Sequence, residues 1–299
     1  LGVLNWGEEN MDNNPIFIDP YNNNYQLSDF SPAIGSGQSE STPLTDIEGN
    51  PRPNPVGTNP DMGAYENPLG EQESVIYGDV TMNGEVSSFD ASLILRHMVG
   101  LDTLNYLQQL FGDVSQNDEI SSLDASYILQ HVVGLLDEFP HTPDNLLTFG
   151  EFIMEDQHAS IGETIQIPIK IINDSNIHSF SGIIHYDPEI LLLETLETGD
   201  YFSNSILIYN ANDQGEVYVT LSGVNPNHES DVIATAIFTI FDEFNNYTTV
   251  ALTELVLNEN DSIEPVASMS INSTLEIDQQ FPTIYTLYQN YPNPFNPST

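Results

Sequence analysis

The sequence predicts a multidomain, mainly β chain with one small helical domain near its middle. Three observations carry this prediction. Short apolar triplets alternate with Asn, Pro, Gly and Asp over residues 1–70, one segment is duplicated within residues 78–134, and apolar and polar residues alternate from about residue 147 to residue 277. Turn-separated triplets and period-two alternation are typical of strands, whereas each duplicated segment ends in an amphipathic, helix-like run.

The composition restricts the classes of partner. The 299 residues, 39% of them hydrophobic, are enough for two or three domains with cores. With 45 acidic residues against three basic ones, the formal net charge is −42, which excludes nucleic acid and anionic membranes as partners because both require a basic face. Such a charge favours cations as binding partners and a location in an ion-rich exterior, outside the cell. No apolar run approaches the ~20 residues that span a bilayer.

Gly78–Gly100 aligns with Gly112–Gly134 without a gap, at an offset of 34 residues. A 34-residue period is also typical of helical tetratricopeptide arrays. Here, however, the shared residues are Asp, Asn and Ser rather than two apolar helical faces. They occupy the ligand positions of a twelve-residue calcium loop, in which about six to eight oxygens surround the ion at about 2.3–2.6 Å.

Two calcium sites are therefore predicted. The candidate ligands are Asp79, Thr81, Asn83, Glu85 through its carbonyl, Ser87 and Asp90 in the first loop, and Asp113, Ser115, Asn117, Glu119 through its carbonyl, Ser121 and Asp124 in the second. Gly84 and Asp118 stand at position 6, where the turn requires a left-handed backbone. An alternative, that Ser87 and Ser121 are simple helix N-caps, explains the helices but not the repeated ligand spacing.

A helix is predicted after each loop and none before it. The apolar spacing in both copies is amphipathic, and Gly100 and Gly134 are placed to end the two helices. Each copy has a calcium loop whose ligand set ends in Asp, followed by one helix. This arrangement resembles a type I dockerin, whose calcium loops are F-hands.

The dockerin resemblance implies a cohesin as partner. By that resemblance, the partner-binding residues would be Ser88, Phe89, Arg96, His97, Ser122, Leu123, Gln130 and His131. Phe89 and Leu123 replace the small hydroxyl residue common there, so we expect a specificity unlike that of the best-known cellulosomes. Thr81 and Ser115 replace the usual Asn or Asp, so we expect weak sites, in the ~10⁻⁴–10⁻³ M range of extracellular modules.

The N-terminal 70 residues carry the strings NPIFIDP, SPAIGSG and PDMGAYE. They resemble the closing rungs of a right-handed parallel β-helix of the pectate-lyase-like class. Few rungs are present, and the chain opens without an initiator Met or a signal core, so we expect a piece of a longer protein. No catalytic motif is present, and with 45 acidic residues a glycosidase-like carboxylate pair carries no information.

The second half predicts a β-sandwich with strands at 164–172, 215–221 and 234–240. Pro168 predicts an edge strand or a bulge. The order of motifs, from GETIQIPIKIIN to VIATAIFTI, resembles a cohesin, a jelly-roll relative of carbohydrate-binding modules. A fibronectin-like or other Ig-like spacer is the alternative.

The final string, LYQNYPNPFNPST, resembles the start of the C-terminal sorting domain of type IX secretion, with a proline-rich linker as the alternative. The predicted division is 1–70 for the β-helix end, 71–145 for the dockerin-like domain, 146–278 for the cohesin-like sandwich and 279–299 for the linker and sorting domain.

The expected function is an extracellular or cell-surface, calcium-dependent assembly or adhesion segment of a modular polysaccharide-binding or polysaccharide-degrading protein. Its partner would be a cohesin in trans or the chain's own 146–278 domain. The alternative is the C-terminal part of a secreted β-helix polysaccharide lyase or glycoside hydrolase with its active site upstream.

Overall fold

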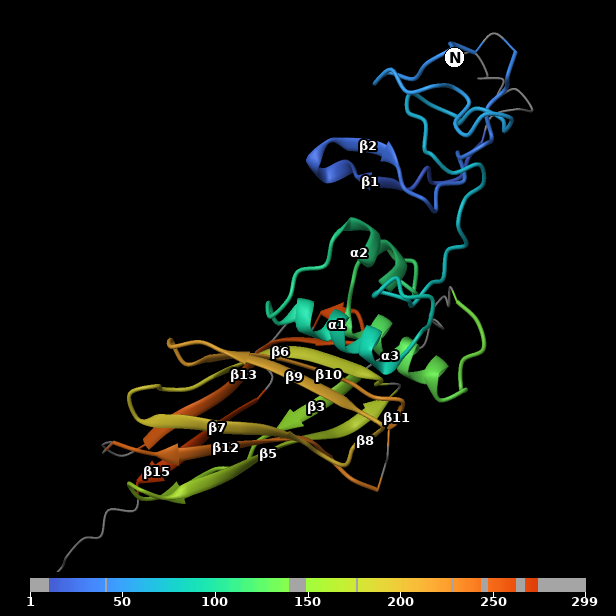
Figure 1. Cartoon of the computed structure of the whole chain (residues 1–299). Helices are drawn as coiled ribbons and strands as arrows, with labels where there is room; N and C mark the ends of the chain where they lie inside the picture. Colours follow the sequence, from blue (N-terminus) through green and yellow to red (C-terminus); the bar gives the residue numbers. More distant parts are fainter. Residues whose placement is uncertain are drawn as a thin grey trace, which may run out of the picture.

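A computed structural model describes residues 11–40, 42–139, 149–175, 177–226, 229–242, 247–261 and 267–273. Three parts follow one another along the chain, and the small helical domain lies between the turn-rich N-terminal part and a β-sandwich (Figure 1). None of the helices in these ranges combines the length and hydropathy of a membrane span.

The N-terminal part is mostly turns around one hairpin. Strand β1 (Phe17–Asp19) pairs antiparallel with β2 (Asn24–Leu27) across the short 3-10 helix η1 (Pro20–Asn22). Arg52 and Glu66 form a buried ion pair at 2.6 Å. Residues 11–40 and 42–70 contain no stacked parallel strands, and the β-helix end stays a prediction.

The helical domain contains α1 (Ser88–Met98), α2 (Tyr106–Gly112) and α3 (Ser122–Val132). The predicted helices after both loops are confirmed. Each begins with a capping box, Ser87 with Asp90 and Ser121 with Asp124. Each ends at a left-handed glycine, Gly100 or Gly134 (φ 75° and 76°), with the paired backbone hydrogen bonds of a Schellman motif.

Helix α2 corrects the prediction that no helix precedes either loop. It leads directly into the second loop, whose first residue, Asp113, is its C-cap. Asn105 and Gln108 form a reciprocal capping box at its start, with both hydrogen bonds at 3.0 Å. The Asn-x-x-Gln spacing was the available signal, but seven residues are too few to show an amphipathic period.

The sandwich has two main sheets. One has the order β4-β15-β13-β6-β10-β9 with β14 paired to β13, the other has the order β3-β5-β12-β7, and β8 pairs with β11. The strands are β3 (Phe149–Ile153), β4 (Gln157–Ala159), β5 (Thr164–Ser175), β6 (Ser179–His185), β7 (Leu191–Thr198), β8 (Phe202–Ser203), β9 (Ile206–Ala211), β10 (Glu216–Ser222), β11 (Asn225–Pro226), β12 (Val232–Ile240), β13 (Tyr247–Leu257), β14 (Asn260–Asp261) and β15 (Ala267–Ser273). Only the β4–β15 pair is parallel among the described strand pairs.

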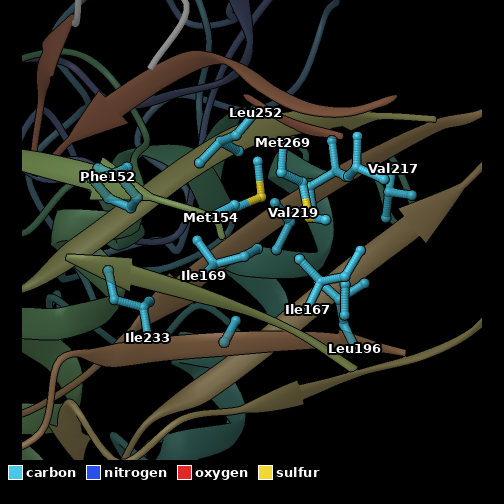
Figure 2. Packing of buried hydrophobic residues seen from close by; sticks show 14 of the residues in the cluster. Phe152, Met154, Ile167, Ile169, Leu196, Val217, Val219, Ile233, Leu252 and Met269 are labelled. Carbon is cyan, nitrogen blue, oxygen red and sulfur yellow. The ribbon is translucent and has the colours of Figure 1, made fainter. Parts of the chain in front are cut away.

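The sandwich core forms where the inward residues of the two sheets meet (Figure 2). Ile167 and Ile169 of β5 face Val217 and Val219 of β10 in one buried cluster. Each such side chain contributes ~1.5–3 kcal/mol on burial. The three strands predicted from alternation, at 164–172, 215–221 and 234–240, correspond to β5, β10 and β12.

Pro168 lies in a strand that has a neighbour on both sides over only part of its length. Strand β5 lies between β3 and β12, and Pro168 pairs with Thr235 of β12. Strand β3 pairs only with the Lys170–Ser175 end of β5. The half of β5 that holds Pro168 therefore has an open side, where a missing N–H is tolerated.

Candidate calcium loops and docking interface

The two loops fold in the same way around their first aspartates. Asp79 accepts hydrogen bonds from the backbone N–H groups of Asn83 at 3.1 Å and Gly84 at 2.7 Å. Asp113 accepts the equivalent bonds from Asn117 at 3.2 Å and Asp118 at 2.9 Å. The carboxylate at position 1 therefore shapes each loop from inside.

The aspartates at position 12 close the loops. Asp90 accepts from the backbone N–H groups of Thr81 and Ser87, both at 2.9 Å. Asp124 accepts from Ser115 at 3.0 Å and Ser121 at 2.9 Å. Both carboxylates are fully buried, so each ties the start of its helix to the opposite side of its loop.

The predicted left-handed backbone at position 6 is confirmed, with φ of 92° at Gly84 and 69° at Asp118. Met82 and Gln116, at position 4, also adopt a left-handed φ of 57°. This second left-handed residue was not predicted, because neither Met nor Gln favours that conformation. Its occurrence at the same position in both copies shows that the loop geometry, rather than residue preference, imposes it.

The donor sets fit a calcium ion. All candidate ligands are oxygens, and the buried carboxylates have no protein cation, because Arg52, Arg96 and Lys170 are paired with Glu66, Asp102 and Glu155. An unpaired buried charge is costly. The described residues hold no group of three or more His, Cys, Asp and Glu side chains arranged as a metal site. That fits the composition of these loops, whose other ligands are hydroxyl, amide and carbonyl oxygens.

Burial raises the pKa of the Asp124 carboxyl to about 7, although its hydrogen bond from Ser115 acts in the opposite direction. The neighbouring negative charges of Glu259 and Asp113 raise this pKa further. A cation bound among these groups would offset both effects.

Helix α3 lies against β6 and β10 of the sandwich, while α1 contacts β9 and β10 (Figure 1). Two hydrogen bonds join α3 to the end of β10. Ser126 Oγ donates to the Gly223 carbonyl at 2.7 Å, and Ser222 Oγ donates to the Ser122 carbonyl at 2.6 Å. The Asn210 side-chain amide on β9 donates to the Val99 carbonyl, just after α1, at 2.9 Å.

Apolar side chains fill the space between these hydrogen bonds. Val224, Ile206 and Ile208 of the sandwich belong to the same cluster as Leu123 and Leu129 of α3. The helical domain therefore shares its core with the sandwich.

The structure brings only some of the predicted partner-binding residues to this interface. Ser122 and Leu123 are buried there, and Gln130 donates to Ser126 Oγ. The matching residues of the first copy, Ser88 and Phe89, are exposed, Phe89 by 60%.

The remaining predicted residues make contacts within the helical domain. Arg96 pairs with Asp102, and His97 Nδ1 lies 3.3 Å from the Asp102 carbonyl oxygen. The His131 ring lies against Phe139 at 4.8 Å between centroids. As a partner surface, this set remains a prediction.

Sequence reasoning missed Ser126, Val99 and Glu259. Ser126 could have been found, since it lies one helical turn after Ser122 on the same face. Glu259, in the turn between β13 and β14, accepts from Ser121 Oγ at 2.8 Å and Ser115 Oγ at 3.3 Å. No sequence signal links it to a loop 138 residues away.

Comparison with known proteins identifies both domains. Residues 77–133 match the dockerin type I domain family, and residues 151–277 match the cohesin domain family. The chain contains a dockerin followed by a cohesin. The cohesin match replaces the Ig-like alternative for the sandwich. No curated protein matched the chain.

Several solved cohesins resemble the cohesin domain at low similarity. The sixth cohesin of Acetivibrio cellulolyticus scaffoldin B, solved with a mutant Cel5 dockerin, is 15% identical and covers 42% of this chain and 98% of its own, with a TM-score of 0.36. The non-cellulosomal cohesin of Archaeoglobus fulgidus is 18% identical, with coverages of 42% and 90% and a TM-score of 0.34. The cohesin module of a Clostridium perfringens family 33 glycoside hydrolase is 12% identical, with coverages of 42% and 98% and a TM-score of 0.37. The domain assignments rest on the family matches.

Proposed function

We propose that this chain is a calcium-dependent assembly module in which the dockerin domain docks on the cohesin domain of the same chain. The contact of α3 with β6 and β10 supports this most directly. Buried hydrogen bonds, from Ser126 to Gly223 and from Ser222 to Ser122, join the two domains. Hydroxyl–carbonyl pairs of this kind are costly to leave unmade.

The proposed role of calcium is to hold the loops that start the docking helices. Two ions, one in each loop, would be bound by the twelve residues with ligand spacing. Asp124 completes the capping box of α3 two residues before Ser126, whose hydroxyl donates to the cohesin domain. Calcium in the second loop would therefore stabilise the end of α3 that makes the interface.

We further propose that the module works outside the cell, in a polysaccharide-associated assembly. The net charge of −42 supports an ion-rich setting. Carbohydrate binding and a β-helix end in residues 1–70 are parts of this proposal, and the C-terminal part of an upstream β-helix lyase or hydrolase is its alternative. The sorting-domain string falls at residues 287–299, outside the described residues.

Hydrogen exchange of the full chain, with calcium and with chelator, tests the proposed function. We expect chelation to raise amide exchange in α1 and α3, and in the 206–211 and 216–222 strands that they cover, because the helices lose their anchored starts. Strand β12, in the opposite sheet, is the internal control and should keep its protection. Unchanged exchange in β9, β10 and the helices would contradict calcium-dependent docking.

A further inference from the structure

A carboxylate of the cohesin domain enters the second calcium loop. Glu259 Oε1 lies 2.8 Å from Ser121 Oγ and 3.3 Å from Ser115 Oγ. These two hydroxyls occupy ligand positions 9 and 3. Oxygens that bind one calcium at about 2.3–2.6 Å necessarily lie about 3 Å from their neighbours in the coordination sphere, and the Glu259 oxygen stands at that spacing from both.

The two serine hydroxyls at this site are shared between carboxylates. Ser121 Oγ is 2.8 Å from Glu259 and also 3.1 Å from an Asp124 carboxylate oxygen. Ser115 Oγ is 3.3 Å from both Glu259 and Asp113. A hydroxyl has one proton to donate, so each serine can satisfy only one of its two carboxylates at a time. A cation among the oxygens would satisfy all of these contacts together.

Charge leads to the same conclusion. Glu259 adds a third negative charge that repels those of Asp113 and Asp124, and all three Lys and Arg residues of the chain pair with acids elsewhere. A divalent cation is the counter-charge that this arrangement needs.

The turn that holds Glu259 is fixed to the sheet. Asn258 adopts a left-handed φ of 54°, and its side-chain oxygen accepts from the backbone N–H groups of His178 at 2.9 Å and Ser179 at 3.2 Å. Its own N–H donates to the Ser179 carbonyl at 3.0 Å. Asn258 is therefore a positioning residue that holds the turn against β6 and directs Glu259 toward the loop.

The first loop shows no counterpart. Within the described part of the chain, the hydroxyls of Thr81 and Ser87 donate to Asp79 and Asp90 of their own loop, and Ser87 Oγ also accepts from the Phe89 N–H.

We propose that Glu259 is a ligand of the calcium in the second loop, so that this ion bridges the dockerin and cohesin domains. The inference rests on the proposed function, because it requires that the loop bind calcium. Glu259 would supply the third carboxylate that the second loop lacks because Ser115 stands at position 3. The second site would then bind calcium more tightly than the first.

Calorimetric calcium titration of the chelator-stripped full chain tests the proposal. Asp79→Asn disables the first loop and leaves the second to be measured. In that background, Glu259→Gln should weaken calcium binding at least about tenfold, because it removes a charged ligand. In an Asp113→Asn background, which leaves only the first loop, Glu259→Gln should change nothing. Glu254→Gln, an exposed change of equal charge on β13, is the matched control and should match its parent in both backgrounds.

A second measurement separates a ligand from a merely structural glutamate. With calcium, Glu259→Gln should increase amide exchange at the start of α3. With chelator, it should leave exchange unchanged or reduce it, because one repelling carboxylate is gone. Equal loosening in both conditions, or unchanged affinity in the Asp79→Asn background, would overturn the proposal and leave the proposed function standing. Absence of calcium binding by the wild-type chain would refute the proposed function itself.

Discussion

Ser92 and Ser126 occupy the same position in the two copies of the repeat, yet their hydroxyls bond to different domains. Ser92 Oγ donates to the Phe89 carbonyl of its own helix at 2.8 Å. Ser126 Oγ donates across the interface to Gly223. The asymmetry of docking is thus visible at single residues of a nearly symmetric domain.

Ser126→Ala is expected to weaken docking. The change leaves the buried Gly223 carbonyl without its donor, which costs about 1–3 kcal/mol. Native-state hydrogen exchange of α3 should show a lower opening free energy by that amount. Ser92→Ala, at the matched position, should stay within about 0.5 kcal/mol of wild type. Equal effects of the two substitutions would argue against the interface.

Burial lowers the pKa of His178, beside the Glu259 turn, from its ordinary value. A histidine with a lower pKa in the folded state binds fewer protons there than in the unfolded state. Its stabilising contribution is therefore intact above the unfolded pKa of about 6.5 and is lost as the pH falls through the folded pKa.

Urea unfolding at pH 7 and pH 5, in saturating calcium, tests this expectation. His178→Gln should lose less stability than wild type between the two pH values, whereas His158→Gln, at an exposed position, should keep the wild-type dependence. An identical pH dependence in all three proteins would contradict the assignment.

The candidate calcium ligands could be named from the sequence because their spacing lies within twelve consecutive residues and occurs twice. Glu259 could not be, because its place depends on the packing of β13 against β6, which no local pattern specifies. The same holds for Ser222 and Gly223, whose partners belong to another domain.

At the scale of elements, helices and strands followed local patterns, and sheet order did not. Capping residues and glycines marked both ends of α1 and α3. In contrast, β6 lies between β13 and β10 in its sheet, although other strands separate it from both along the chain. Such an order results from the closure of the sandwich as a whole, so alternation predicted β5, β10 and β12 but not their neighbours in the sheets.

The turn before β10 offers a steric test of the surface that receives the helices. Gly215 and Gly162 both have left-handed φ, 80° and 85°. A Cβ at Gly215 would overlap the Tyr186 carbonyl oxygen, whereas at Gly162 it would meet nothing within 4 Å. Gly162→Ala should cost about 1–2 kcal/mol of cohesin-domain stability, and Gly215→Ala at least about 2 kcal/mol more. Similar losses of unfolding free energy in the two variants, measured by urea unfolding, would contradict this geometry of the turn.

At the scale of the whole molecule, the proposed docking within one chain would occupy the cohesin surface formed by β6, β9 and β10 together with α3 of the dockerin. A partner that uses either surface would then have to displace the internal contact, so free partners would bind more weakly than to the separate domains. Calcium would regulate this competition, because it stabilises the helices that make the contact.

Spin-label distance measurement tests intramolecular, calcium-dependent docking most directly. The chain has no cysteine, so Leu135→Cys on the dockerin and Asp213→Cys on the cohesin, both exposed, give one unique pair. With calcium, we predict a single narrow distance that survives dilution with excess unlabelled chain, and with chelator a broad distribution. A broad distribution in calcium, or a distance lost on dilution, would contradict docking within one chain.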